Sequence, residues 1–179
     1  MKDTNLNNNN PFFEAKNLLE SLIDILHTHK WLQAEHGEVE QLIEQDGFEL
    51  MRLLLQGHLD ERARQETEFD CISHGTEEHT HKRKNCSRQL NSIFGKVTSH
   101  RRSYSNGGVH SIFPQDAQLN LSKDQYSDGL RRQIAFTVSG QSFDKASESI
   151  SRNTATTVAK RQIENITRLM SQDFDAFYK

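Results

Sequence analysis

The spacing of apolar residues in the last third of the chain, residues 126–178, constrains the fold most. Phe143, Ala146 and Ile150 are three and four residues apart, as on one face of an amphipathic helix. A longer apolar series with the same spacing runs through Ile163, Ile166, Met170, Phe174 and Phe177. The segment 153–157, NTATT, separates the two series and has turn and helix-capping side chains. Two helices joined by a tight polar turn form a helix-turn-helix outline.

A further helix is expected just before this outline, at residues 129–138. Its apolar side chains are spaced to face inward, which directs Arg131 and Arg132 outward. Ser122 and Ser127 are both suited to cap its N-terminus. We therefore expect residues 122–179 to form the helix-turn-helix region, with a long last helix.

The N-terminal third has a different character. Residues 1–11 include the run NLNNNN and predict a disordered tail. Residues 12–68 predict two helices, the first ending near residue 29 and the second running from about Glu35 or Glu38 to Leu59. Gly47 leaves open a break in the second helix. An antiparallel helical pair with an acidic outer face is typical of a scaffold or dimerisation element.

Residues 69–121 predict a basic β-meander and a connector. Strands are expected at residues 88–94, 97–104 and 109–113, with turns at Gly95-Lys96 and Asn106-Gly107. The outer face of this sheet would carry Lys96, His100, and Arg101 or Arg102. Residues 114–121, PQDAQLNL, are expected to be extended. Taken together, the patterns predict an α+β fold: a helical pair, a small antiparallel meander and a helix-turn-helix.

Charge is distributed unevenly along the chain. Residues 12–70 hold 14 acidic and 5 basic side chains, whereas residues 79–104 hold 7 basic and no acidic ones, within a net charge of −3. A basic segment beside an acidic one suggests an anionic partner, and nucleic acid is the foremost candidate. Ordinary solvated surface charge is the alternative interpretation.

Several other classes of protein do not fit the composition. Mean hydropathy is −0.80 and no apolar run approaches the roughly 18 to 20 residues of a membrane span. The Asn-rich N-terminus does not have the apolar core of a signal peptide. Two cysteines provide no disulfide framework, so we expect a cytoplasmic protein.

A group of cysteines and histidines offers a possible zinc site. The spacing C-x2-H-x4-H-x-H-x4-C starts at Cys71, and the candidate ligands are Cys71, His74, His81 and Cys86. This spacing matches neither a zinc ribbon nor a finger with two cysteines and two histidines. We therefore expect exposed turn and strand residues here and no cofactor, with a zinc-stabilised binding module as an alternative.

Six short motifs occur in an order that is typical of one family. They are FGKVTSHRRSY (94–104), PQDAQLNL (114–121), YSDGLRRQIA (126–135), SFDKA (142–146), AKRQIE (159–164) and DFDAFY (173–178). Together they resemble the N-terminal region of bacterial insertion-sequence transposases of the ISKra type. The resemblance extends from about Phe12 to the last residue. Two departures are Thr154-Ala155, where the family has Thr-Gly, and Gln115, where it has Leu.

The resemblance implies recognition of the terminal repeats of a mobile element during DNA transposition. In the family, an RNase-H-like catalytic domain follows the DFDAFY motif, whereas this sequence ends at Lys179. Asp173 and Asp175 are two residues apart on a helix, so they point to different faces. We therefore expect a truncated or frameshifted DNA-binding fragment that is not an enzyme by itself. A protein-interaction or homo-oligomerisation remnant is the alternative.

Candidate DNA contacts follow from these expectations. Arginine suits guanine, asparagine suits adenine, and lysine suits phosphate. In the last helix the outward candidates are Lys160, Arg161, Asn165 and Arg168. Flanking phosphates would be bound by Arg131, Arg132 and Arg152, and by Arg101 and Arg102 on the basic meander.

Overall fold

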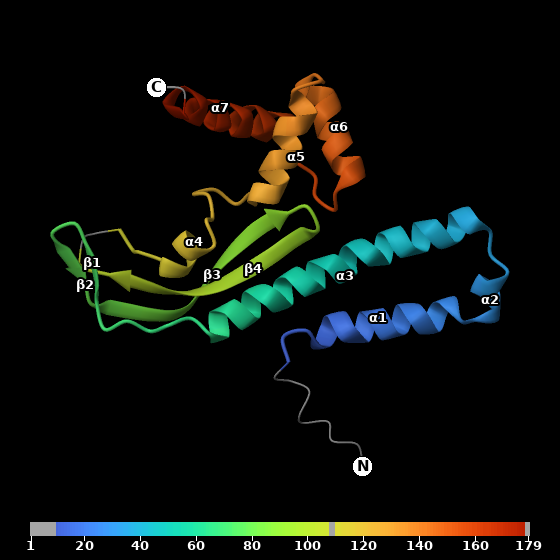
Figure 1. Cartoon of the computed structure of the whole chain (residues 1–179), viewed down its shortest axis with the longest axis horizontal. Coiled ribbons are helices and arrows are strands. Elements are labelled where there is room, and N and C mark those ends of the chain that lie inside the picture. Colours follow the sequence, from blue (N-terminus) through green and yellow to red (C-terminus); the bar gives the residue numbers. More distant parts are fainter. Residues whose placement is uncertain (1–9, 108–109, 178–179) are drawn as a thin grey trace, which may run out of the picture. The chain divides into compact units, whose positions relative to one another are not determined.

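The computed structural model describes residues 10–107 and 110–177, with only the helical backbone for residues 173–177. It contains both helices and antiparallel strands, which confirms the predicted α+β class (Figure 1). The helices are α1 (Phe13–Leu26), α2 (His29–Leu32), α3 (His36–Arg64), α4 (Pro114–Gln118), α5 (Asp128–Val138), α6 (Phe143–Asn153) and α7 (Lys160–Phe177). Within the described ranges, no helix combines the length and the apolar character that crossing a membrane requires.

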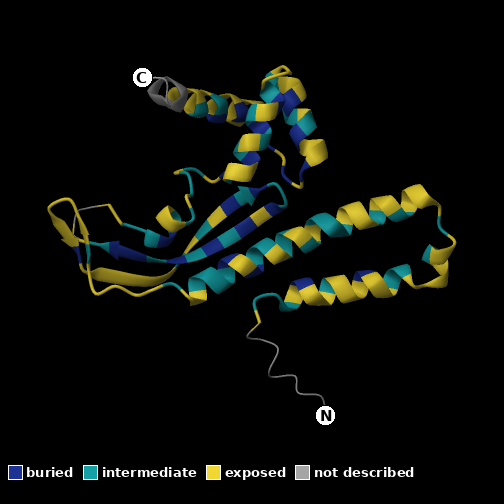
Figure 2. Ribbon diagram, viewed as in Figure 1, coloured by how far each residue is buried: buried dark blue, intermediate teal, exposed yellow. Residues whose placement is uncertain are grey.

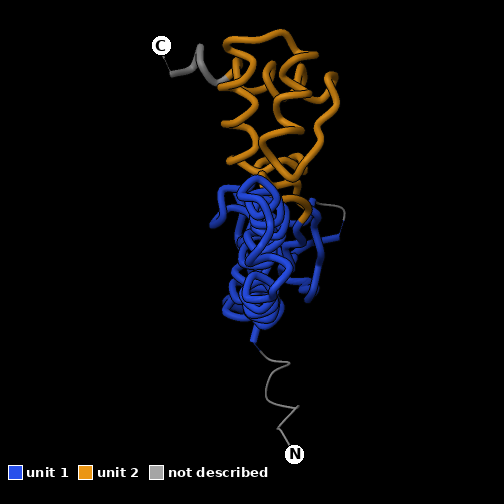
Figure 3. The backbone as a smooth tube through the Cα atoms, turned by 90° about the vertical axis from the view of Figure 1, so that its right-hand side faces the viewer, with its two compact units in different colours: residues 1–89, 97–121 blue, residues 90–96, 122–179 orange. Residues whose placement is uncertain are grey.

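The chain divides into two compact units that interleave in sequence (Figure 3). Unit 1 comprises Met1–Gln89 and Val97–Leu121, and unit 2 comprises Leu90–Lys96 and Ser122–Lys179. The acidic helices and most of the basic segment therefore share one unit. Residues 90–96, at the tip of a β-hairpin, belong with the three C-terminal helices.

The acidic helices form an antiparallel hairpin of α1 and α3, joined by the short α2 (Figure 1). Glu35 caps α3 in a capping box with Glu38, since each side chain accepts a hydrogen bond from the other residue's backbone N–H. The helix continues through Gly47 without the break that the sequence left open. Gly57 is buried in α3, and a Cβ there would lie 2.6 Å from the carbonyl oxygen of Pro11. A glycine is therefore required where the start of α1 crosses α3.

The strands form two separate hairpins in the described residues, not the predicted three-stranded meander. β1 (Ile72–His74) pairs antiparallel with β2 (Glu77–His79), a small sheet that the sequence did not predict. β3 (His81–Ser92) pairs with β4 (Gly95–Ser105) and begins well before the predicted start at residue 88. The turn lies at Ile93-Phe94, and Gly95 follows it with a φ of +111°. The predicted turn was misplaced because Gly95 supplies its positive φ at the end of the turn and not within it.

The third predicted strand and the extended connector are also corrected. Tyr104 and Ile112 form a single antiparallel bridge, with N···O distances of 2.9 and 2.8 Å, and residue 109 lies outside the described residues. Residues 114–118 form α4, because Pro114 at the first helical position needs no hydrogen-bond acceptor and has a helix-compatible φ. The backbone N–H of Leu121 then donates to the carbonyl of Asp116 at 2.9 Å.

Unit 2 has the best-formed apolar core of the described chain. Ser127 caps α5 and Ser142 caps α6, each accepting a backbone N–H bond at its hydroxyl. The three helices bury one cluster, which largely matches the predicted inward positions and is visible as the dark-blue residues of α5, α6 and α7 in Figure 2. Its members are Tyr126, Leu130, Ile134, Ala146, Ile150, Val158, Ile163 and Ile166.

A threonine-rich linker joins α6 to α7 and is longer than the tight turn predicted. It runs from Thr154 to Ala159, and Thr154 has an extended backbone. The hydroxyl of Thr156 donates to the carbonyl of Ser92 at 2.6 Å, and the N–H of Ala155 donates to the carbonyl of Ile93 at 3.0 Å. The linker is thus fixed by the tip of the β3–β4 hairpin. Ala155 has no positive φ, so the glycine of the family motif is not needed here.

Candidate nucleic-acid interface

The outer face of α7 presents a stripe of exposed polar side chains. Arg161, Asn165, Arg168 and Gln172 follow one another at intervals of four, three and four residues, so they share one face of the helix. All four are exposed. Ile163 and Ile166 lie in the core on the opposite face and fix the rotation of the helix. We call these four residues the α7 stripe.

The side chains of the α7 stripe are not engaged by other parts of the described chain. No hydrogen bond or ion pair involves the guanidinium groups of Arg161 and Arg168 within residues 10–107 and 110–172. The amides of Asn165 and Gln172 are likewise without a partner in that range. Sequence reasoning missed Gln172, although its spacing of four from Arg168 was a sufficient signal. Toward residues 10–107 and 110–172, these groups therefore keep their hydrogen-bonding capacity unused.

Lys160 stands at the start of α7 and already has an intramolecular partner. Its Nζ lies 2.7 Å from Oδ2 of Asp144 in the first turn of α6. That hydrogen bond, together with the carboxylate charge, raises the pKa of Lys160. Both side chains are largely exposed, so the pair is solvent-screened and contributes little to stability. Lys160 can exchange Asp144 for a phosphate at small cost.

The arginines predicted on α5 and α6 differ in availability. Arg132 is exposed on α5, and Arg152 is exposed on α6 with Glu148 3.4 Å away. Arg131 does not point outward as predicted, since its side chain is only 13% exposed and pairs with Asp124. Arg132 and Arg152 therefore remain candidates for phosphate contacts, and Arg131 takes a structural role.

The Arg131–Asp124 pair holds the segment that enters α5. Burial raises the pKa of Asp124, but the hydrogen bond from Arg131 and the backbone N–H of Tyr126 outweigh it and hold the pKa below its usual value. The hydroxyl of Ser122 also donates to Asp124, at 3.0 Å. The ionised carboxylate of Asp124 thus holds together the residues that lead into α5.

Arg101, which the sequence left as an alternative to Arg102 on the outer face of the sheet and as a phosphate contact, is buried in unit 1. It is 9% exposed, its Nε lies 3.0 Å from Oδ1 of Asp116, and its guanidinium covers the ring of Phe113 at 4.1 Å. Arg88 binds the other oxygen of Asp116 at 2.9 Å. Burial lowers the pKa of Arg101, partly offset by Asp116. Strand alternation turns Arg101 inward, where α4 supplies a carboxylate, so the expected phosphate contact by this arginine is not retained.

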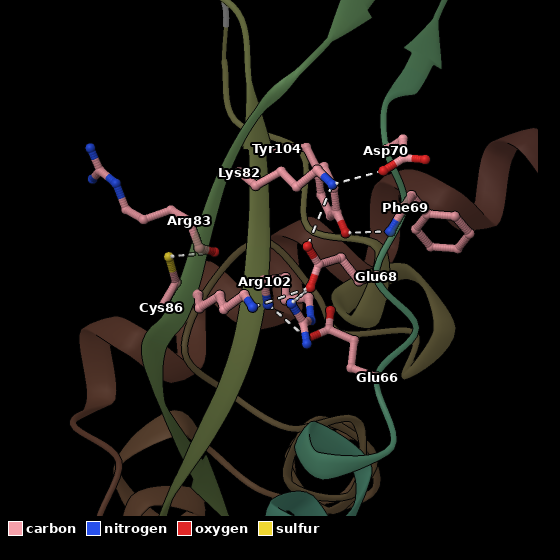
Figure 4. Close-up of polar contacts among 10 residues, drawn as sticks. Glu66, Glu68, Phe69, Asp70, Lys82, Arg83, Cys86, Arg102 and Tyr104 are labelled. Atoms are coloured by element: carbon pink, nitrogen blue, oxygen red, sulfur yellow. Dashed lines mark hydrogen bonds and ion pairs between the residues drawn. The ribbon is translucent and has the colours of Figure 1, made fainter.

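Arg102 lies on the other side of the strand and is bound by the acidic segment that follows α3 (Figure 4). Its guanidinium Nη1 lies 2.5 Å from Oε2 of Glu68, and its backbone N–H donates to Glu66 at 2.8 Å. Lys82 and Lys84 also pair with Glu68, at 3.4 and 3.3 Å. Part of the positive charge of the basic segment is thus neutralised within unit 1.

The four candidate zinc ligands do not converge. Cys71 and the two histidines, His74 and His81, are exposed, whereas Cys86 is half-buried and donates to the hydroxyl of Ser103 at 3.4 Å. Among residues with described positions, no three His, Cys, Asp or Glu side chains are placed to hold one metal ion. Asp173 and Asp175 lie outside the residues whose side chains are described.

Comparison with known proteins identifies a partial relative. The chain is 29% identical over 87 residues to the "UPF0236 protein in vanSb 3'region" of Streptococcus gallolyticus. The match covers 48% of this chain but only 19% of that protein, so it corresponds to about a fifth of the relative's length. No protein-family model matches the chain. No solved structure matches it either.

Proposed function

We propose that unit 2 binds DNA, with α7 as the recognition helix. The observation that carries this proposal is the α7 stripe, whose exposed side chains lie opposite a packed core. Arginine at positions 161 and 168 suits the O6 and N7 atoms of guanine, while Asn165 and Gln172 suit the N6 and N7 atoms of adenine. α5, α6 and the anchored linker supply the rigid support that base readout requires.

Phosphate contacts are assigned to the exposed basic residues around this helix. Lys160 lies in its first turn, while Arg132 and Arg152 are exposed on α5 and α6. Such contacts set the register of the protein on the duplex and carry no sequence information themselves. Arg101, Arg102 and Arg131 are left out, because each is already paired and at least half-buried.

We further propose that the DNA is the terminal repeat of an insertion sequence and that this chain is the DNA-recognition part of a transposase. The ordered motifs support this assignment, since YSDGLRRQIA, SFDKA and AKRQIE fall on the three helices of unit 2. The proposal is limited to recognition and assigns no catalytic step to the described residues.

Fluorescence anisotropy with the full chain and labelled duplexes tests the proposal. We expect binding to element-end duplexes that weakens steeply as salt rises from roughly 50 to 200 mM. Arg161→Ala should lower the affinity about tenfold and relax the sequence preference, while Lys160→Ala should weaken all duplexes alike. Lys30→Ala, an exposed cation of unit 1, is the matched control.

Two results would overturn the assignment. The first is that no salt-sensitive binding to any duplex, specific or random, is measured. The second is that Arg161→Ala and Arg168→Ala bind as the wild-type protein does, which would remove α7 from the interface. Salt-sensitive binding without preference for element ends would retain DNA binding and remove the transposase assignment.

A further inference from the structure

The α1–α3 hairpin leaves an apolar flank uncovered. Leu19 and Ile23 of α1 are 44% and 47% exposed, and Ile43 and Leu54 of α3 are both 45% exposed. Met51, one turn before Leu54, is 37% exposed. We call these five residues the apolar flank. Among the described residues of α1, only Ala15 and Leu22 are buried, so the hairpin leaves part of its apolar surface in water.

Helix geometry places the apolar flank on one side of the hairpin. Around the axis of α1, the side chains of Leu19 and Ile23 are rotated away from those of the buried Ala15 and Leu22, in the direction in which the helix winds. Around the axis of α3, Ile43 and Leu54 are rotated in the same sense away from the face that carries the buried Gly57. Because the helices are antiparallel, these offsets bring both sets to the same side. The result is a continuous apolar surface across two helices and not scattered single residues.

Charge along the hairpin is polarised. The half around the connection, residues 24–46, has six acidic and one basic side chains. The other half, residues 12–23 and 47–64, has five acidic and four basic ones. On the side of the apolar flank, Lys16 lies one turn before Leu19 and Glu40 one turn before Ile43. The flank therefore has a lysine near one end and a glutamate near the other.

We propose that the apolar flank is the interface of a homodimer, in which two hairpins pack side by side and antiparallel. A two-fold axis near Gly47 would place Lys16 of each protomer beside Glu40 of its partner and keep the two acidic ends apart. Two helical hairpins joined in this way form a four-helix bundle, which buries apolar surface that a single hairpin leaves in water. This inference does not depend on the proposed DNA binding.

Sedimentation equilibrium of the full chain tests the dimer. We expect a monomer–dimer equilibrium whose dissociation constant rises at least tenfold in Ile43→Lys, because a charge is then buried at the interface. Leu32→Lys is the matched control, since Leu32 is 71% exposed on α2 outside the apolar flank. Far-ultraviolet circular dichroism verifies that each variant remains folded. A wild-type protein that stays monomeric at high concentration would overturn the proposal.

A charge swap tests the antiparallel orientation independently of folding. Lys16→Glu should weaken the dimer, and Glu40→Lys in the same chain should restore it, because the Lys16–Glu40 contact reforms with reversed sign. Disulfide formation adds a second test in a Cys71→Ser, Cys86→Ser background. Gly47→Cys has free space at the Cβ and should cross-link, whereas Leu54→Cys should not. Failure of the charge swap, or equal cross-linking at both positions, would rule out this arrangement.

Discussion

Arginine side chains in this chain fall into two groups that composition does not distinguish. Arg101 is 9% exposed against Asp116 and Phe113, whereas Arg161 and Arg168 are exposed on α7. Arg101 is already paired with the half-buried carboxylate of Asp116, whereas the exposed side chains of Arg161 and Arg168 are accessible from solvent. The distinction gives each group a different expected phenotype on substitution.

Arg101→Ala should destabilise unit 1 by about 3 kcal/mol, because it removes one partner from a buried ion pair. Denaturation followed by the fluorescence of Trp31, the only tryptophan and a residue of unit 1, measures this loss. Arg83→Ala, at an exposed strand position, should leave the transition unchanged. Equal stability of the two variants would contradict the structural role of Arg101.

The Asp124–Arg131 pair predicts a pH dependence for unit 2. The folded state lowers the pKa of Asp124, so its stabilisation is present above the unfolded value of about 3.9 and is lost as pH falls through the folded pKa. Asp124→Asn should therefore cost about 1 kcal/mol at neutral pH, allowing for partial exposure, and almost nothing once the pH is below the folded pKa of Asp124.

Thermal unfolding monitored by circular dichroism across pH measures this difference. Asp144→Asn is the control, because the Asp144–Lys160 pair is largely exposed and its loss should change little at any pH. A constant difference between wild type and Asp124→Asn at all pH values would show that Asp124 does not act through its charge.

At the scale of elements, the linker between α6 and α7 is attached to the tip of the β3–β4 hairpin. Thr154 and Thr156 are buried in it, and the hydroxyl of Thr154 donates to the carbonyl of Ile150 at 2.8 Å. Thr156 extends the connection to Ser92 at the hairpin tip. The start of α7 is thereby fixed by side-chain hydrogen bonds and not by a tight turn.

Thr156→Val should cost unit 2 about 1 to 2 kcal/mol, because the shape is kept while the buried carbonyl of Ser92 loses its donor. Thr157→Val is the matched control, since Thr157 is exposed and its hydroxyl lies 3.4 Å from the hydroxyl of Ser151, which is also exposed. Thermal unfolding of both variants gives the comparison. A Thr156→Val protein as stable as Thr157→Val would show that the linker does not depend on this bond.

The sequence predicted helices better than strands for a physical reason. The apolar spacing of Ile163 and Ile166 reports a local period of 3.6 residues, so α7 and its buried face were readable. Strand pairing depends on distant partners, and the third strand reduced to a bridge at Ile112 because Pro114 begins a helix directly afterwards. The inward orientation of Arg101 depends on α4, which no local pattern around that arginine indicates.

In the candidate site, too, local sequence patterns predicted exposure but not the contacts made with other parts of the chain. Arg161, Asn165 and Arg168 were identified from the helical period alone, because exposure on a single amphipathic helix follows from its apolar face. Arg131 has the same local pattern as Arg132, but Asp124, seven residues earlier, turns toward it and binds it. Partners of that kind lie in loops whose path the sequence period does not specify.

At the scale of the whole molecule, the two proposals make a joint prediction that neither makes alone. A dimer formed through the hairpins has two copies of α7, so a duplex with two recognition sites can engage both. Binding of the second α7 is then intramolecular, which raises the apparent affinity by about a hundredfold over a one-site duplex at favourable spacing.

The Ile43→Lys variant separates the contribution of dimerisation from the contribution of DNA recognition by each α7. Ile43 lies on the apolar flank and outside unit 2, so the variant should bind a one-site duplex as wild type does. On a two-site duplex it should lose most of the roughly hundredfold gain, because its two copies bind independently. Arg161→Ala should instead weaken both duplexes. Anisotropy titrations with both duplexes at several spacings measure this, and a wild-type protein without any two-site preference would uncouple dimerisation from DNA recognition.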